Sequence, residues 1–173
     1  MRRGISVALF AFASTVLPAV APASPPASQD ARLAVVKREL EATFAARMHA
    51  FEAKDYATLM AQVSPQYTAV RPDGTMMNRD DIAGYIRNNL DRWVRIVRQS
   101  NVIEGLRLDD KGNAVAEMRQ NLARIQIVDG KEVLVESGVL QTETWTPSAN
   151  GWQLLNVKDE REKKLSVDGK PRS

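Results

Sequence analysis

Apolar residues recur at helical spacing through the first part of the chain after residue 28. At about 100° per residue they fall within one narrow arc of a helical wheel. They are Leu33, Val36, Leu40, Phe44 and Phe51. This pattern predicts an amphipathic helix over residues 29–53, capped by Ser28 or Asp30. His49 lies opposite the apolar arc and is expected to face solvent, whereas Arg47 lies within the arc.

A second, short helix is predicted over residues 56–63, with Asp55 as its N-cap. Ser64-Pro65 is expected to end that helix, because the residue before a proline disfavours helical geometry. Residues 66–71 are then predicted to form a strand, followed by a turn at residues 72–74.

A third helix is predicted to begin after Asn78, which precedes two aspartates suited to the first helical turn. Its apolar stripe has spacings of four, four, three and four, and comprises Ile82, Ile86, Leu90, Trp93 and Val97. The helix is therefore expected to reach Val97. Arg92, Arg95 and Arg98 flank the stripe, and we interpret them as a solvated edge rather than an anion site.

From Asn101 the apolar period changes to two, which indicates strands. Four candidate strands cover residues 102–108, 113–128, 132–146 and 152–157. Asp-Gly and Asn-Gly pairs between them are strong hairpin signals, so an antiparallel meander is predicted. Neither face of residues 114–128 is apolar throughout, which predicts a bulge or bend near residues 119–121. Residues 160–173 are mostly charged and are expected to form a flexible tail.

The N-terminus has the pattern of an export signal. Arg2 and Arg3 precede an apolar run over residues 5–17, and small residues follow at the spacing of a cleavage site. We therefore expect a signal peptide over residues 1–23, a linker over residues 24–30 and a domain over residues 31–159. The protein is then exported, periplasmic or secreted. The alternative is a membrane anchor, but the apolar run is shorter than the ~18 residues that would span a bilayer.

The amino-acid composition limits the partners and the kinds of chemistry that are expected. A chain of 173 residues suffices for one domain with a core, and a 44% hydrophobic and 26% charged content is typical of globular proteins. Without Arg2 and Arg3 the net charge of +3 nearly vanishes, so neither nucleic acid nor, after signal removal, a membrane is indicated as partner. The absence of cysteine excludes disulfides and thiolate chemistry, and one histidine excludes a multi-histidine metal site within one chain. We expect no metal and no cofactor.

The order helix, helix, strand, helix and four antiparallel strands accompanies several short motifs. They are Ala50-Phe51-x-x-Lys54-Asp55, Pro72-Asp73-Gly74, Thr142-x-Thr144-Trp145 and Asn150-Gly151-Trp152-x-Leu154. In these features residues 33–159 resemble the SnoaL-like branch of the nuclear transport factor 2-like (NTF2-like) superfamily. The resemblance implies an α+β fold in which three N-terminal helices pack in a strongly curved antiparallel sheet. It also implies a cone with an internal apolar pocket, and a homodimer.

Members of that superfamily include ketosteroid isomerases, polyketide cyclases, epoxide hydrolases and dehydratases, and also proteins that only bind or assemble. Several catalytic relatives have histidines near the end of the last strand, where residues 154–159 here contain none. Histidine-based dehydratase chemistry is therefore not expected. A carboxyl group in an apolar cavity, with a raised pKa, is the remaining means of acid–base catalysis.

Three charged residues occupy positions expected to be apolar: Arg47, Glu104 and Glu143. A buried charge needs a partner, so Arg47 is predicted to pair with Glu143, or as second choice with Glu104. The remaining candidate ligand-binding residues are Tyr67, Tyr85, Trp93, Gln141 and Trp145. The alternative is a structural ion pair at the mouth of the cone, or residues on the outer face of the sheet.

Two functions are consistent with these patterns. The first is an exported protein that binds a small hydrophobic ligand or serves as an accessory module without chemistry. The second is a cofactor-independent isomerase, cyclase or hydrolase that uses a pocket carboxylate on a small hydrophobic substrate. An open cavity with Glu143 or Glu104 beside Arg47 would favour the second, and a cavity filled by side chains would favour the first.

Overall fold

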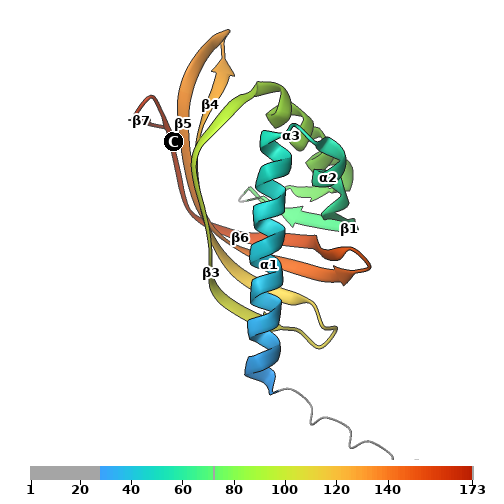
Figure 1. Cartoon of the computed structure of the whole chain (residues 1–173). Helices are drawn as coiled ribbons and strands as arrows, with labels where there is room; N and C mark the ends of the chain where they lie inside the picture. The colour runs from blue at the N-terminus through green and yellow to red at the C-terminus, as the bar shows by residue number, and fades with distance from the viewer. Residues whose placement is uncertain (1–27, 72, 173) are drawn as a thin grey trace, which may run out of the picture.

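The computed structural model describes residues 28–71 and 73–172, so the predicted signal peptide lies outside the described residues. Helix α1 (Gln29–Glu52) lies across one side of a curved sheet (Figure 1). The remaining elements follow in the order α2 (Tyr56–Ala61), β1 (Val63–Val70), β2 (Met76–Asn78), α3 (Arg79–Arg92), β3 (Trp93–Leu108), β4 (Ala114–Val128), β5 (Lys131–Ser148), β6 (Gly151–Val167) and β7 (Lys170–Pro171). None of the described helices is long and apolar enough to cross a membrane.

The sheet has the strand order β2-β1-β6-β5-β4-β3, with β7 paired to β6. Its long strands form the predicted antiparallel meander, but β1 pairs with β6 in parallel, so the sheet is mixed rather than purely antiparallel. The physical reason is that no hairpin joins β1 to β6. The chain returns to β1 only after α3 and four other strands, β2 to β5, so no turn fixes their relative direction.

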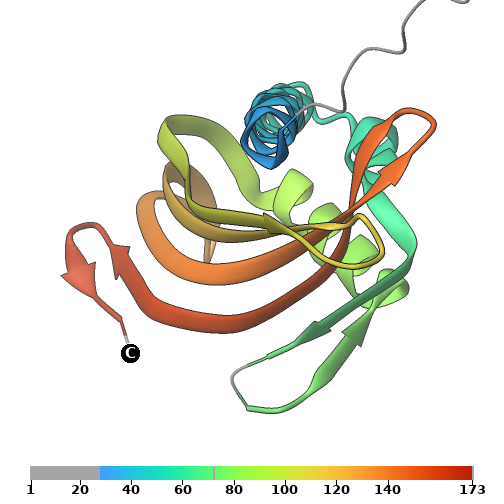
Figure 2. The ribbon, with the colours of Figure 1, turned by 90° about the horizontal axis from the view of Figure 1, so that it is seen from below.

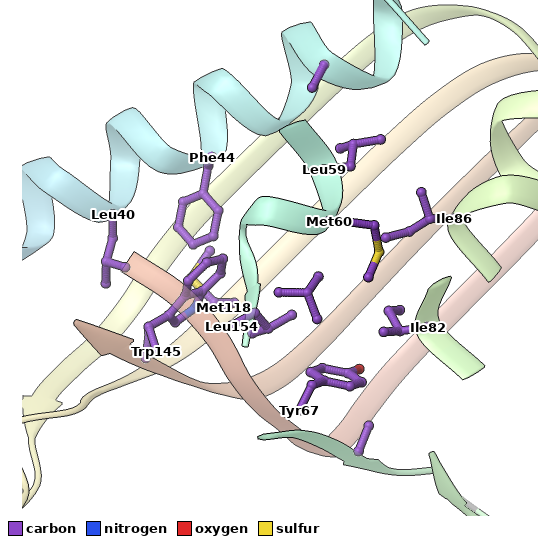
Figure 3. Packing of buried hydrophobic residues seen from close by; sticks show 14 of the residues in the cluster. Leu40, Phe44, Leu59, Met60, Tyr67, Ile82, Ile86, Met118, Trp145 and Leu154 are labelled. Atoms are coloured by element: carbon purple, nitrogen blue, oxygen red, sulfur yellow. The ribbon is translucent and has the colours of Figure 1, made fainter. Parts of the chain in front are cut away.

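Helix α1 begins and ends close to its predicted limits. The Ser28 hydroxyl accepts a hydrogen bond from the Ala31 amide at 3.3 Å, as an N-cap does. Its apolar face is buried, and the ring of Phe44 meets the ring of Trp145 edge-on at 5.2 Å between centroids. Figure 3 shows Leu40 and Phe44 directed from α1 toward Trp145 and Met118 of the sheet. The amphipathic pattern therefore positioned this helix correctly.

The second helix ends earlier than predicted, and Ser64-Pro65 lies inside β1 instead of stopping a helix. A proline is tolerated here because the β1–β6 pairing is irregular between Val63 and Thr68. The amide of Leu154 donates to the carbonyl of Gln62, which joins β6 to the start of β1.

Helix α3 ends at Arg92, so the prediction that it extends to Val97 is wrong. Its first part follows the sequence pattern, with Asn78 in a capping box with Asp81. At its end, the Lys54 ammonium donates to the carbonyls of Leu90 and Trp93, which a continuing helix would use internally. The chain continues directly into β3, which starts at Trp93.

The sheet curls strongly around the helices (Figure 2), but the bend does not arise where the sequence predicted it. The β4–β5 pairing runs without interruption, and residues 119–121 pair in regular register with β3. Register shifts lie instead in the β3–β4 pairing and in the β5–β6 pairing. The curvature is therefore accompanied by irregularities on both sides of the β4–β5 pair, not by a bulge in β4.

Residues 160–167, expected to begin a flexible tail, form the second half of β6 and pair with β5. Two of their charges have partners on β4, the next strand beyond β5. Arg161 contacts Glu117 at 2.5 Å, and Glu162 contacts Arg119 at 2.8 Å. Beyond Val167 a tight turn with Gly169 at φ 73° leads into β7. The charged composition correctly indicated that these side chains face solvent. It did not show that pairing with β5 holds their backbone in a strand.

Candidate functional site

A cavity of about 510 Å³ is lined by side chains of the helices and of the sheet. Its lining combines apolar side chains of α1, α3 and β6 with polar side chains of β3, β4 and β5. Arg71, Lys163 and Lys164 line it and are exposed, so they mark its open end. Buried lining residues such as Glu143 and Leu154 mark its closed end.

Strand pairing determines which side chains form the floor of the cavity. Alternate residues of a strand point to the same face, so residues 137, 139, 141 and 143 of β5 face the helices together. On β4 the corresponding positions are Gln120, Leu122 and Arg124. The polarity of the floor therefore changes along β4 and β5. It is apolar at the Trp145–Ala114 pair, and beyond Glu143 it includes polar residues and finally Arg124.

Glu143 is a buried carboxylate, only 3% exposed, with three hydrogen-bond donors. Its Oε1 accepts from Gln120 Nε2 and from Gln141 Nε2, both at 2.7 Å, and its Oε2 accepts from Trp145 Nε1 at 2.9 Å. Burial raises the pKa of Glu143 above its usual value, while these donors and Arg47 act in the opposite direction. The side chain is thus held in one orientation, at the border of the cavity.

Arg47 reaches the same cavity from α1, as its place in the apolar arc predicted. Within the described part of the chain its guanidinium has neither a hydrogen bond nor an ion pair within 4.0 Å. Burial lowers the pKa of Arg47, and the nearby charge of Glu143 opposes that shift. Protein surrounds the guanidinium, but part of its surface remains accessible because it borders the cavity.

The predicted direct pair of Arg47 and Glu143 is absent from the described structure: the two side chains border the same cavity and each affects the pKa of the other, but no hydrogen bond or ion pair joins them. Glu104, the second choice, does not enter the cavity. It is exposed and pairs with Arg119, whose Nε lies 2.5 Å from Glu104 Oε1. The reason is a register shift between Ile103 and Gly105, which reverses the alternation along β3. Val102, 49% exposed, precedes the shift, and Leu106 after it packs on the core.

The predicted aromatic residues occupy different parts of the site. Tyr67 is buried and lines the cavity, and burial raises the pKa of its hydroxyl to about 12. Tyr85 lines the cavity but is 54% exposed. Trp93 lines it and stacks on Phe51, with 5.0 Å between ring centroids. Trp145 is fully buried and supports Glu143 from the core.

Sequence reasoning missed Gln120, Asn89, Gln99 and Arg124, which also line the cavity. Gln120 and Arg124 lie on β4, where the sequence pattern did not show which face is inward. Asn89 lies on α3 and is only 8% exposed, yet its Nδ2 has no hydrogen-bond partner among the described residues. Gln99 Oε1 is also buried without a partner there. Since buried polar groups are normally paired, these two atoms indicate positions where a bound molecule would make contacts.

Within residues 28–71 and 73–172, no group of three or more histidine, cysteine, aspartate or glutamate side chains has an arrangement suited to a metal ion. The polar side chains that line the described cavity offer guanidinium, carboxylate, amide and phenol groups, among others.

No known family profile matches this chain, and no curated protein is similar to it in sequence. Solved structures are similar in fold. A conserved protein from Planctomyces limnophilus superposes with a TM-score of 0.58 at 12% identity, over 73% of this chain and 95% of its own. A putative dehydratase of the NTF2-like family from Streptomyces avermitilis gives a TM-score of 0.53 at 15% identity, over 73% and 95% of the two chains.

An NTF2-like superfamily protein from Salmonella enterica gives a TM-score of 0.53 at 16% identity, over 79% of this chain and 94% of its own. The chain thus has the NTF2-like fold: an α+β structure with a curved sheet and helices packed on its concave side. The resemblance drawn from the sequence motifs is confirmed for the fold.

Proposed function

We propose that this protein binds a small, largely apolar organic molecule in the cavity, with a polar group of that molecule at Arg47. The observation that carries the proposal is the Arg47 guanidinium, which is enclosed by protein but has no hydrogen-bond partner among the described residues. A cavity of about 510 Å³ lies within the usual range for small-molecule sites. A carbonyl or hydroxyl oxygen of the ligand would accept from Arg47.

Glu143 complements this role. Its Oε1 already accepts two hydrogen bonds and its Oε2 accepts one, so Oε2 retains capacity to accept a bond from a ligand hydroxyl. A ligand with a carbonyl or hydroxyl group at one end of an apolar body would therefore satisfy both charged side chains.

The proposal is tested with a neutral fluorescent probe, N-phenyl-1-naphthylamine, which emits strongly only in apolar surroundings. We expect the wild-type protein to bind it, and Val139→Trp, which places a large ring on the cavity floor, to abolish binding. The matched control is Val102→Trp, on the exposed face, which should bind as the wild type does. Equal binding by the two variants would refute binding in the cavity. Mass spectrometry of molecules retained by the purified protein would identify the natural ligand.

An acid–base enzyme is the second candidate, favoured by one observation. Glu143 has a raised pKa and borders an open cavity near a cation, as expected of a general base. Glu143 would accept a proton from a carbon next to a carbonyl group, and Arg47 would stabilise the negative charge that forms on the carbonyl oxygen. The neighbour from Streptomyces avermitilis is described as a putative dehydratase, which is compatible with such chemistry.

Deuterium exchange into the ligand distinguishes a binding protein from an acid–base enzyme. If Glu143 is a base, a retained carbonyl ligand incubated in heavy water should gain deuterium with the wild type but not with Glu143→Gln. Exchange that is equal in both proteins, or absent, would leave binding alone as the function.

Export and dimer formation are further parts of the proposal. Export is supported by the basic, apolar and small-residue pattern of residues 1–23, and intact-mass measurement of secreted protein should show a start near Ser24. A homodimer is inferred from the family resemblance alone, and light scattering during size-exclusion chromatography would test it. A monomer at micromolar concentration would contradict it.

A further inference from the structure

Two of the arginines that line the cavity, Arg47 and Arg124, differ in whether an opposite charge lies near them. Arg47 has the carboxylate of Glu143 as an opposite charge. Arg124 has only neutral hydrogen-bond partners: its Nε donates to Gln126 Oε1 and its Nη1 donates to Ser137 Oγ, both at 3.0 Å. A second cation, Arg92, acts on it electrostatically and lowers its pKa. Among the described residues, no carboxylate therefore neutralises this half-buried guanidinium.

Arg124 lies near a stripe of residues on α3 and at the start of β3. Tyr85, Asn89 and Trp93 follow one another at intervals of four residues, and all three line the cavity. The Arg124 guanidinium lies 4.8 Å from the centroid of the Trp93 ring, at one end of this stripe, and Tyr85 at the other end is near enough to affect the pKa of Arg124. Asn89 lies between them in the stripe and lines the same cavity as Arg124, and its Nδ2 is buried without a hydrogen-bond partner among the described residues.

Gln99 adds a polar atom to the same end of the cavity. It pairs across the sheet with Leu122, which pairs with Ser137, the partner of Arg124. All three line the cavity, and Gln99 Oε1 has no hydrogen-bond partner in the described structure. Amide oxygen and nitrogen can exchange places by rotation, so Gln99 offers either a donor or an acceptor.

We propose that the ligand is a small organic acid, whose anionic group binds Arg124 and Asn89 while its apolar body extends toward Arg47. This inference rests on the proposed binding function and names its ligand class. Unpaired Nη2 of Arg124 and Nδ2 of Asn89 would both donate to the same anionic group. The exposed Arg71, Lys163 and Lys164 at the open end would attract such an anion.

The competing explanation is that Arg124 only holds Trp93 and Ser137 in place. Two probes with the same aromatic body distinguish the two roles. 1-Anilinonaphthalene-8-sulfonate carries an anionic group, whereas N-phenyl-1-naphthylamine is its neutral counterpart. A residue that recognises the anion affects only the first probe, and a residue that only shapes the cavity affects both.

For Arg124→Gln, we expect the Kd of the sulfonate probe to rise about tenfold or more, and that of the neutral probe to change less than about twofold. Asn89→Leu removes the unpaired amide and should act in the same direction to a smaller extent. It also provides a test if Arg124→Gln does not fold. The matched control is Arg107→Gln, which removes the same charge from an exposed arginine outside the cavity and should leave both probes unchanged.

Equal weakening of both probes in Arg124→Gln would overturn the proposal and leave a structural role for Arg124. The proposal would also be overturned if Arg124→Gln binds the sulfonate probe as the wild type does. If Arg124→Gln does not fold, the same result with Asn89→Leu would overturn it. In either case, binding in the cavity would stand. If neither probe binds the wild type, the proposed function and this inference both fail.

Discussion

The interaction between Arg47 and Glu143 makes a quantitative prediction. The two groups share a cavity but do not touch, since no guanidinium nitrogen of Arg47 lies within 4.0 Å of a Glu143 oxygen. Two unit charges 4 Å apart at an effective dielectric constant of about 20 interact by about 4 kcal/mol. The larger separation and the accessible cavity reduce this value, so we expect a coupling energy of about 1–2 kcal/mol.

The assay is a double-mutant cycle on Arg47→Met and Glu143→Gln, with the free energy of unfolding measured in urea. Glu143→Gln alone should cost about 2–3 kcal/mol, because an amide cannot accept from all three donors and Arg47 loses its opposite charge. The double variant should lose less than the sum of the single variants. A control cycle that replaces Arg47→Met by Arg107→Met should give no coupling, because Arg107 lies outside the cavity.

A coupling energy near zero in the first cycle would refute the reasoning. Arg47 would then be solvated through the cavity, and its lack of a partner would no longer indicate a ligand. A coupling well above 4 kcal/mol would show that the two side chains form a direct ion pair in solution.

Three further predictions concern pH, helix termination and the exposed face of α1. Because the folded pKa of Glu143 is raised, its contribution to stability is fully present below the unfolded pKa of about 4.3 and is lost as pH rises through the folded pKa. The stability difference between wild type and Glu143→Gln should therefore shrink as pH rises above about 4, and a difference that grows with pH would contradict the raised pKa. Lys54→Met, which removes the donor to the carbonyls of Leu90 and Trp93, should cost about 2 kcal/mol in urea unfolding, whereas Lys131→Met on the exposed start of β5 should cost little. His49→Ala should change stability by about 0.5 kcal/mol or less, since its side chain is 84% exposed, and a loss above about 2 kcal/mol would contradict that placement.

The elements that the sequence predicted well are those determined by local physics. Helix α1 follows from its apolar period, and α3 begins at Asn78 because that side chain caps the first amides. The hairpin at Asp129-Gly130 has positive φ at both residues, which few residue types other than Asn, Asp and Gly adopt readily. Local pattern thus also placed Arg47 on the inner face of α1.

Three features were decided by partners that are distant along the chain. Helix α3 ends at Arg92, and at this end the Lys54 ammonium donates hydrogen bonds to the carbonyl groups of Leu90 and Trp93. Residues 160–167 are ordered because β5 offers a strand edge, although their composition is that of a tail. Glu104 faces outward because a register shift before Leu106 exchanges the inward and outward positions of β3. The alternation of apolar residues in the sequence does not show such a shift.

Some residues of the candidate site could also be predicted from the sequence, and others could not. Sequence alone placed Arg47 and Glu143 on inward faces, because a charge within an apolar pattern is unusual enough to identify. It could not find Arg124 or Asn89, because β4 has no clean alternation and an asparagine on a helix is ordinary. Only the tertiary structure shows that, among the described residues, Arg124 lacks a carboxylate partner and the side-chain Nδ2 of Asn89 lacks a hydrogen bond, since both depend on what the other strands and helices bring near.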